Sequence, residues 1–290
     1  MRYSVKLSYN GAPFCGWQRQ PGAPSVQEEL EKALGTLTGA PVTVTGAGRT
    51  DTAVNAIGYV ASFEAREGLD TPDFCYKLNA ILPAAICVLS VDAASPDFNA
   101  RFDAKRREYC YFLHRKKDPF VEAFSYRCGY PELDFDAMNC AAQLLLGTHD
   151  FSCFEKTGSD NKTSICTVYE AGWHQYVPSH LAVLSVAAKS LNDSGLSNPS
   201  TPDSTYLESV TPTKPDTYVP RSKDGGYWYF RIAADRFLRN MVRAIVGTLI
   251  EVGRGKRSVE SVAELIAGGT RSDAGESVPG HALFLSHIDY

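Results

Sequence analysis

Residues 3–9 read Tyr-Ser-Val-Lys-Leu-Ser-Tyr, with an apolar or aromatic side chain at every second position and polar ones between. This period of two predicts a β-strand with one buried face. The period then changes, because Ser25 and Glu28, three residues apart, form a capping box that predicts the start of a helix. Apolar side chains at helical spacing follow: Val26, Leu30, Ala33, Leu34 and Leu37.

The rest of the first hundred residues completes one order of elements. Two short β-type runs, at 42–45 and 58–63, follow the first helix. A second helix is predicted from Thr71-Pro72, because proline is well tolerated where its missing N–H would have no helical partner. A strand at 86–91 ends the segment. The predicted order is β-α-β-β-α-β.

A comparable order recurs after about residue 105. The expected elements are a strand through Tyr109 and Tyr111, a helix from Asp134 to a C-cap at Gly147, strand-like runs at 165–173 and 181–187, a strand at 227–232, helices at 235–252 and 259–267, and a last strand at 283–288. We therefore predict an α+β protein of two ferredoxin-like (RRM-like) β-α-β-β-α-β halves, residues 1–104 and 105–290, with mainly antiparallel sheets and a cleft between them.

Residues 190–226 differ from the rest of the second half. They are rich in Ser, Thr, Pro, Asp and Gly and nearly lack large aliphatic side chains. Such a segment cannot bury enough apolar surface to offset its ordering entropy. We interpret it as a polar low-complexity insertion that forms a long loop or extended hairpin between two strands.

The composition narrows the class of protein. With 290 residues and 44% apolar content, the chain can bury one large core or two smaller ones. No stretch approaches the roughly 20 apolar residues that cross a bilayer, and the first residues enter the strand pattern without the apolar core of a secretory signal. We expect a soluble, cytoplasmic protein with no membrane partner.

The eight cysteines contain no C-x-x-C pair, and the six histidines form no ligand pair with them. A zinc site needs closer ligand spacing, and a disulfide framework is improbable in a chain of this length without an export signal. The sequence therefore predicts buried free thiols and no metal.

The net charge is −4, from 29 basic and 33 acidic side chains, which is not the charge of a protein coated in nucleic acid. Any RNA contact must come from a local patch. Short basic groups exist at 105–107, at 115–117, at 254–257, and at Arg236, Arg239 and Arg243. Each group taken alone is more typical of a solvated surface.

The most unusual segment, residues 45–56, combines Gly46 and Gly48 with Arg49 and Asp51 between two predicted strands. The glycines allow close approach of a ligand or a positive φ. The segment is not a P-loop, which needs G-x-x-x-x-G-K-[ST] leading into a helix. A simple strand connection and a functional loop are equally good interpretations of these residues.

The predicted helix at 235–252 has one broad apolar face bordered by Arg236, Arg239 and Arg243. Arg243 is nearest its middle, and a buried arginine is unfavourable unless it is paired, so it should have a carboxylate partner. A structural ion pair or a stem that extends to solvent is the alternative. Arg236 and Arg239, nearer the helix start, are candidates for contact with phosphate.

Residues 99–111 run from basic side chains directly into an aromatic strand, in which Tyr109 and Tyr111 point to the same face. An aromatic ring beside cations suits a base unstacked from RNA. Packing in the core explains either tyrosine equally well.

Together these segments resemble the bacterial family of tRNA pseudouridine synthases that modifies the anticodon stem-loop, usually called TruA. The matching stretches follow the family's order and cover nearly the whole chain except the insertion: residues 16–20, 25–28, 46–51, 78–80, 82–83, 100–102, 107–109, 145–147, 150–151, 237–247 and 282–284.

The resemblance implies roles for individual residues. Asp51 matches the family's catalytic aspartate, Tyr109 its active-site tyrosine and Arg243 the arginine that pairs with the aspartate. It further implies a homodimer that binds tRNA, isomerises uridines at positions 38–40 and needs no cofactor. The side chains expected to contact RNA are Arg49, Thr50, Arg19, Arg101, Arg236 and Arg239.

The sequence departs from the family beside Asp51. The family usually has Ala-Gly-Val-His-Ala where this chain has Thr-Ala-Val-Asn-Ala, so Ala53 replaces a glycine and Asn55 a histidine. A synthase that acts on other uridines therefore stays an alternative, as does a catalytically silent RNA-binding protein. A metal-dependent phosphodiesterase is disfavoured, because no carboxylate or histidine cluster accompanies Asp51.

Overall fold

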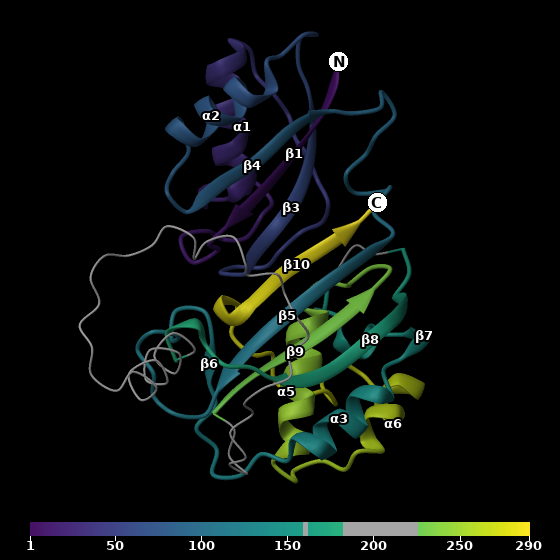
Figure 1. Ribbon diagram of the computed structural model, residues 1–290. Coiled ribbons are helices and arrows are strands. Elements are labelled where there is room, and N and C mark those ends of the chain that lie inside the picture. Colours follow the sequence, from purple (N-terminus) through teal and green to yellow (C-terminus); the bar gives the residue numbers. More distant parts are fainter. Residues whose placement is uncertain (159–161, 182–225) are drawn as a thin grey trace, which may run out of the picture.

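The computed structural model describes residues 1–158, 162–181 and 226–290. Its strands form one ten-stranded, mostly antiparallel sheet in the order β4-β1-β3-β10-β5-β9-β8-β7, with β2 paired to β3 and β6 to β5 (Figure 1). The strands are β1 (Arg2–Tyr9), β2 (Thr45–Gly46), β3 (Asn55–Glu64), β4 (Ile86–Ala93), β5 (Arg106–His114), β6 (Tyr126–Arg127), β7 (Gly147–Asp150), β8 (Ile165–Gln175), β9 (Tyr227–Ala234) and β10 (Leu283–Asp289).

The first segment forms its helices where local signals predict them. Helix α1 (Val26–Thr38) begins at Ser25, whose hydroxyl accepts a hydrogen bond from the Glu28 N–H, and it ends at Gly39 with φ 75°. Helix α2 (Thr71–Ile81) is capped by Asp70 and carries its proline in the first turn. Figure 1 shows both helices against the strands of this segment.

The second segment contains α3 (Phe135–Gln143), α5 (Met241–Gly253), α6 (Ser261–Gly268) and the 3-10 turns η1 (Ser152–Phe154) and η3 (Gly280–Ala282). Two predicted boundaries are wrong. Helix α3 stops before Gly147, which begins β7 with φ 101°. Helix α5 starts at Met241 instead of Asp235, because Asn240 has a left-handed backbone (φ 67°) that interrupts the helical path.

Two further expectations need correction. The run at 42–45 contributes only its last residue to a strand, the two-residue β2. Leu181 lies in a helical turn and not in a strand, and the remainder of the run to residue 187 is outside the described residues. The expected insertion at 190–226 also lies outside them, apart from Gly226.

The two segments share one sheet, joined by the parallel pairing of β3 with β10. Pairing of Leu285 with Ala56 covers edges that would otherwise present free N–H and C=O groups. The register continues in both directions, from Ala56 to Tyr9 on β1 and from Leu285 to Tyr109 on β5. Because paired residues share a face of a sheet, Tyr9 and Tyr109 lie on the same face.

Candidate active site

Asp51 lies in a loop between β2 and β3 that the preceding segment holds in place. Phe14 accepts a hydrogen bond from the Ala53 N–H at 3.2 Å, and Trp17 donates its own N–H to the Thr50 carbonyl at 3.2 Å. Gly16 permits this approach, because its φ is +97° and a Cβ there would lie 2.2 Å from the Thr50 oxygen. Side-chain bulk at Gly16 would therefore push this loop out of place.

Arg243 contacts the carboxylate of Asp51 from the first turn of α5. Its Nη1 lies 3.4 Å from Asp51 Oδ2, and its Nε donates to the Val278 carbonyl at 2.7 Å. The two side chains are 22% and 24% exposed. An arginine at the N-terminal end of a helix faces the positive end of the helix dipole, so a neighbouring carboxylate offsets an unfavourable position. The prediction that Arg243 lies in the middle of the helix is wrong, because α5 begins at Met241. The prediction that Arg243 has a carboxylate partner is confirmed, and Asp51 is that partner.

Tyr109 completes the group from β5. It is 9% exposed and packs edge to face with Phe237, with ring centroids 5.1 Å apart. Burial raises the pKa of its hydroxyl well above the ordinary value, and the nearby Asp51 charge acts in the same direction. Its phenol is therefore neutral and protonated near pH 7. Tyr111, by contrast, is fully buried and belongs to the core.

Arg107 is a further site residue that sequence reasoning did not single out. Its guanidinium donates to the backbone carbonyls of Ala47 at 2.9 Å, Asp235 at 2.9 Å, Arg101 at 2.7 Å and Ala104 at 3.2 Å. It thus ties the Asp51 loop to the strand that carries Tyr109 and to the segment before α5. Its position in a basic run beside Tyr109 could have indicated a role in the site. Its partners are backbone carbonyl groups, however, and these cannot be identified from residue types.

The expected RNA contacts fall into two groups. Arg19, Arg49, Arg101 and Arg239 are exposed, although Arg49 donates to Gln18 at 2.8 Å and Arg19 pairs with Glu31 at 3.2 Å. Arg236 is half-buried, and both it and Arg239 precede α5 instead of lying on it. Thr50 is only 8% exposed and its hydroxyl is 2.9 Å from that of Tyr9, so this side chain points into the protein.

The two family departures have separate structural roles. Asn55 is buried, accepts a hydrogen bond from the Gly11 N–H at 2.8 Å and donates to the His281 carbonyl at 2.7 Å. It therefore links the two segments through hydrogen bonds. Ala53 holds φ 61°, a conformation that glycine adopts more easily.

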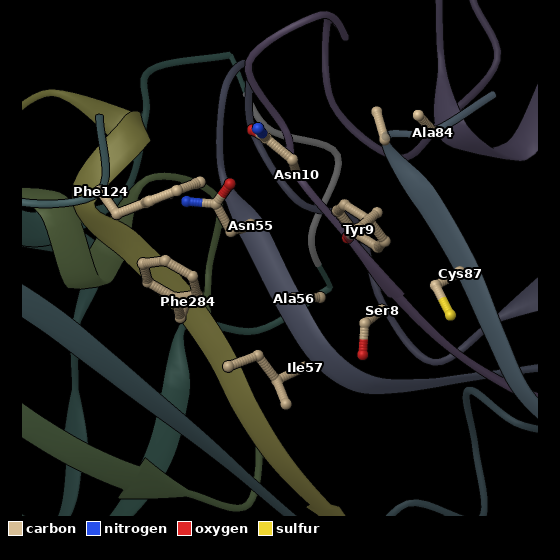
Figure 2. A pocket seen from close by; sticks show the side chains of 11 residues that line it. Ser8, Tyr9, Asn10, Asn55, Ala56, Ile57, Ala84, Cys87, Phe124 and Phe284 are labelled. Atoms are coloured by element: carbon tan, nitrogen blue, oxygen red, sulfur yellow. The ribbon is translucent and has the colours of Figure 1, made fainter. Parts of the chain in front are cut away.

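A pocket of about 270 Å³ lies beside Asn55, between β1, β3, β4 and β10 (Figure 2). Ile57, Phe124 and Phe284 line one side of it, and Cys87 lies across from them. None of Asp51, Tyr109 and Arg243 lines this pocket.

Residues 1–158, 162–181 and 226–290 contain no group of three or more His, Cys, Asp or Glu side chains that could hold a metal ion. The eight cysteines are free thiols, and Cys128, Cys153 and Cys166 are buried. No helix in this described part of the chain is long and apolar enough to cross a membrane.

Comparison with known proteins identifies the class to which this fold and site belong. A family model described as tRNA pseudouridine synthase matches residues 141–290, a part that includes Arg243. The chain belongs to this family.

Its relatives extend the match over the whole chain. Two proteins named tRNA pseudouridine synthase A are similar to all of it: one from Parabacteroides distasonis at 39% identity, covering 96% of that protein, and one from Bacteroides thetaiotaomicron at 41%, covering 90%. A third of the same name, from Bacteroides fragilis, is 41% identical over the whole chain and 96% of its own length.

Proposed function

We propose that this protein isomerises uridine to pseudouridine in the anticodon stem-loop of tRNA, at positions 38–40, with Asp51 as its catalytic carboxylate. The observation that carries the proposal is the convergence of Asp51, Arg243 and Tyr109 from a loop, a helix and a strand. Family membership and relatives named tRNA pseudouridine synthase A support the reaction and the substrate.

The reaction breaks the C1′–N1 bond, turns the uracil and rejoins it to the ribose through C5, so that C5 loses a proton and N1 gains one. Atoms and oxidation state are conserved, so side chains alone can supply the chemistry. Asp51 acts either by covalent addition to the substrate or by abstraction of a ribose proton. Arg243 holds the Asp51 carboxylate from one side, and the carboxylate remains open to substrate because 24% of that side chain is exposed.

Tyr109 contributes a neutral phenol beside this carboxylate. In the proposed complex its ring stacks on the flipped uracil, and its hydroxyl exchanges the C5 proton. A uridine inside a stem-loop reaches this group only after it leaves the base stack, and Gly48, where an added Cβ would have no neighbour closer than Arg107 Nε at 3.9 Å, leaves room for that approach.

Exposed cations near the loop fit the tRNA backbone. Arg49 is next but one to Asp51, and Arg101 donates no hydrogen bond from its side chain to another described residue. We propose that both contact phosphate and that Arg19, Arg236 and Arg239 extend this surface. Because the whole chain carries a charge of −4, we expect phosphate contacts to be confined to these few side chains, and the dependence of affinity on salt should scale with their number.

We infer further that the two segments are ferredoxin-like halves with a cleft between them. The orders β4-β1-β3-β2 in the first segment and β10-β5-β9-β8 in the second support this interpretation, because each equals the 4-1-3-2 order of that motif.

We propose a cytoplasmic homodimer, in which two modest basic surfaces join across a two-fold axis into one longer groove. The acidic net charge of the single chain motivates this proposal. Light scattering should give twice the mass of the chain, and the mass of one chain would contradict it.

The function is tested by mapping pseudouridine in tRNA from cells with and without this protein. We expect its loss at positions 38–40, and tritium release from 5-tritiated uridine in unmodified tRNA by the purified protein. Loss at other positions would favour the alternative uridine specificity. An unchanged map together with no tritium release would reject the activity.

A further inference from the structure

The segment 48–51 alternates between residues held from inside the protein and residues presented outward. Gly48 and Thr50 contact buried tyrosines, whereas Arg49 is exposed and Asp51 is partly exposed. The alternation arises because tyrosines on two neighbouring strands, β3 and β1, bind Gly48 and Thr50.

Tyr59 on β3 binds both backbone groups of Gly48, the carbonyl and the N–H. Its hydroxyl donates to the Gly48 carbonyl at 2.5 Å and accepts from the Gly48 N–H at 3.2 Å. Its ring is fully buried and stacks on Trp17, with centroids 4.1 Å apart. A Cβ at Gly46 would lie 2.3 Å from the Tyr59 hydroxyl, so the loop is seated directly on these rings.

Tyr9 on β1 holds the next alternate residue. Its hydroxyl lies 2.9 Å from the Thr50 hydroxyl, and its ring packs edge to face against Tyr59, with centroids 5.7 Å apart. Burial raises the pKa of both Tyr9 and Tyr59 far above the ordinary value. Both hydroxyls therefore keep their protons near pH 7.

We propose that Tyr59 and Tyr9 are positioning residues, which hold Gly48 and Thr50 so that Asp51 is aimed at the substrate. The proposal rests on the proposed role of Asp51. A backbone N–H or C=O that is partly withdrawn from water is stabilised by a partner in the protein, and Tyr59 supplies both partners for Gly48 with a single oxygen atom. Thr50 belongs to this support and not to the RNA contacts.

The chain offers a matched control in Tyr3. It lies on β1 on the same face as Tyr9, is 2% exposed, and its hydroxyl makes the same double contact. It donates to the Arg66 carbonyl at 3.1 Å and accepts from the Leu69 N–H at 3.3 Å, in a loop other than that of Asp51.

The test compares Tyr59→Phe, Tyr9→Phe and Tyr3→Phe, each of which removes one oxygen atom. We measure steady-state kcat and KM for tRNA, the temperature of thermal unfolding, and amide hydrogen exchange of the 46–52 segment. Tyr59→Phe should lower kcat by about 10- to 100-fold with KM within about twofold, because a misplaced catalytic group slows the chemical step. Tyr3→Phe should unfold at a similarly lowered temperature and keep wild-type kcat.

Tyr9→Phe should lower kcat less, and its effect should vanish when Thr50 is already Val, because the two side chains act as one unit. Exchange at 46–52 should rise in Tyr59→Phe and stay unchanged in Tyr3→Phe.

Wild-type kcat in Tyr59→Phe, an equal loss in Tyr3→Phe, or unchanged exchange at 46–52 in Tyr59→Phe would each overturn the positioning role. An inactive wild-type protein would instead overturn the proposed function, and the exchange measurement would still decide whether Tyr59 anchors the loop.

Discussion

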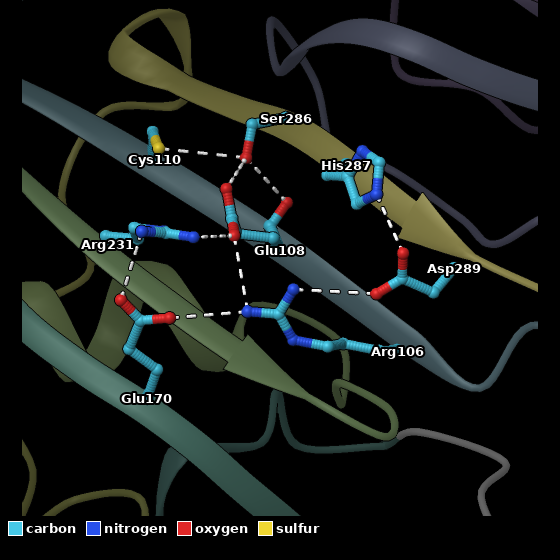
Figure 3. A network of polar contacts seen from close by, with 8 residues as sticks. All are labelled: Arg106, Glu108, Cys110, Glu170, Arg231, Ser286, His287 and Asp289. Carbon is cyan, nitrogen blue, oxygen red and sulfur yellow. Dashed lines mark hydrogen bonds and ion pairs between the residues drawn. The ribbon is translucent and has the colours of Figure 1, made fainter. Parts of the chain in front are cut away.

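Two carboxylates, Glu108 on strand β5 and Asp51 in the loop between β2 and β3, have very different hydrogen-bond surroundings. Glu108 precedes Tyr109 on β5 and so points away from the site, into the network of Figure 3. Its carboxylate accepts from Arg231 at 2.7 Å, from Ser286 at 3.0 Å and from Arg106 at 3.4 Å. Among the described residues, Asp51 has only the 3.4 Å contact with Arg243 on its side chain.

This difference separates a carboxylate that stabilises structure from one that is available for chemistry. Burial alone would raise the pKa of Glu108, but hydrogen bonds from Arg231 and Ser286 outweigh it and lower that pKa. Every lone pair used in this way is lost to a substrate. Asp51 keeps oxygen lone pairs free, because Arg243 contacts its carboxylate from one side only.

The largest expected effect is that of Asp51→Ala. It should lower the rate of pseudouridine formation by about 10⁴-fold or more, because the reacting carboxylate is gone. Binding of tRNA should remain nearly intact, since a carboxylate is an anion and does not attract phosphate. Tritium release and filter binding on the same tRNA measure the two quantities. Retained activity would remove Asp51 from the mechanism.

Arg243→Lys should have the next largest effect. Lysine keeps the charge but cannot hold the Val278 carbonyl and the Asp51 carboxylate from two nitrogens of one rigid plane. We expect kcat to fall by about 10²-fold. Arg231→Lys makes the equivalent change in the network of Figure 3 and should leave kcat unchanged. Equal losses of kcat in both variants would mean that the effect is general and not local.

Glu108→Gln tests the structural side of the comparison. We expect a loss of about 2 kcal/mol in the free energy of unfolding, the usual scale for a buried hydrogen bond to a charged group, with kcat retained. The pKa of Glu108 is lowered in the folded state, so its contribution is present above the ordinary glutamate value of about 4.3 and is lost as pH falls through the folded value. Urea unfolding from pH 7 to pH 3 measures both.

The wild-type protein should therefore lose stability toward acid, and Glu108→Gln should lose less over the same range. If the two profiles run parallel, Glu108 does not supply the acid dependence. If Glu108→Gln instead abolishes activity at full stability, the division between structural and catalytic carboxylates is wrong.

Local signals in the sequence were sufficient for much of the fold. The alternation of residues 3–9 and the Ser25 cap depend only on near neighbours, and β1 and α1 form where predicted. The start of α5 was missed because asparagine adopts a positive φ more readily than most residues but is also found within helices, so its presence at position 240 does not fix the boundary. The pairing of β3 with β10 joins residues from opposite ends of the chain, which no periodicity reports.

The residues of the candidate site likewise fall into those that could be predicted from the sequence and those that could not. Arg243 was predicted to need an acidic partner because charge on an apolar helix is unfavourable when unpaired, and that argument is independent of distance along the chain. Arg107 and Tyr59 were missed, since both act on backbone carbonyl or N–H groups, which every residue has. The residues themselves therefore predicted that Arg243 needs a carboxylate, the family resemblance named Asp51 as that carboxylate, and the groups that hold the Asp51 loop were missed.

The smallest expected effect comes from Ala53→Gly. Among the described residues, two that are not glycine have a positive φ, Ala53 and Asn240. Ala53 lies two positions after Asp51, and Asn240 lies three positions before Arg243. This backbone conformation therefore occurs beside the Asp51–Arg243 pair and not in the network around Glu108. Glycine relieves a left-handed conformation that costs alanine about 1 kcal/mol, but it also gains entropy in the unfolded chain. The net gain in stability should be below about 1 kcal/mol. Ala47→Gly, in the same loop without positive φ, should instead destabilise by a similar amount. Chemical unfolding of both variants decides the matter: equal destabilisation would show that the Ala53 conformation stores no strain, and that only the open carboxylate distinguishes the site from the network around Glu108.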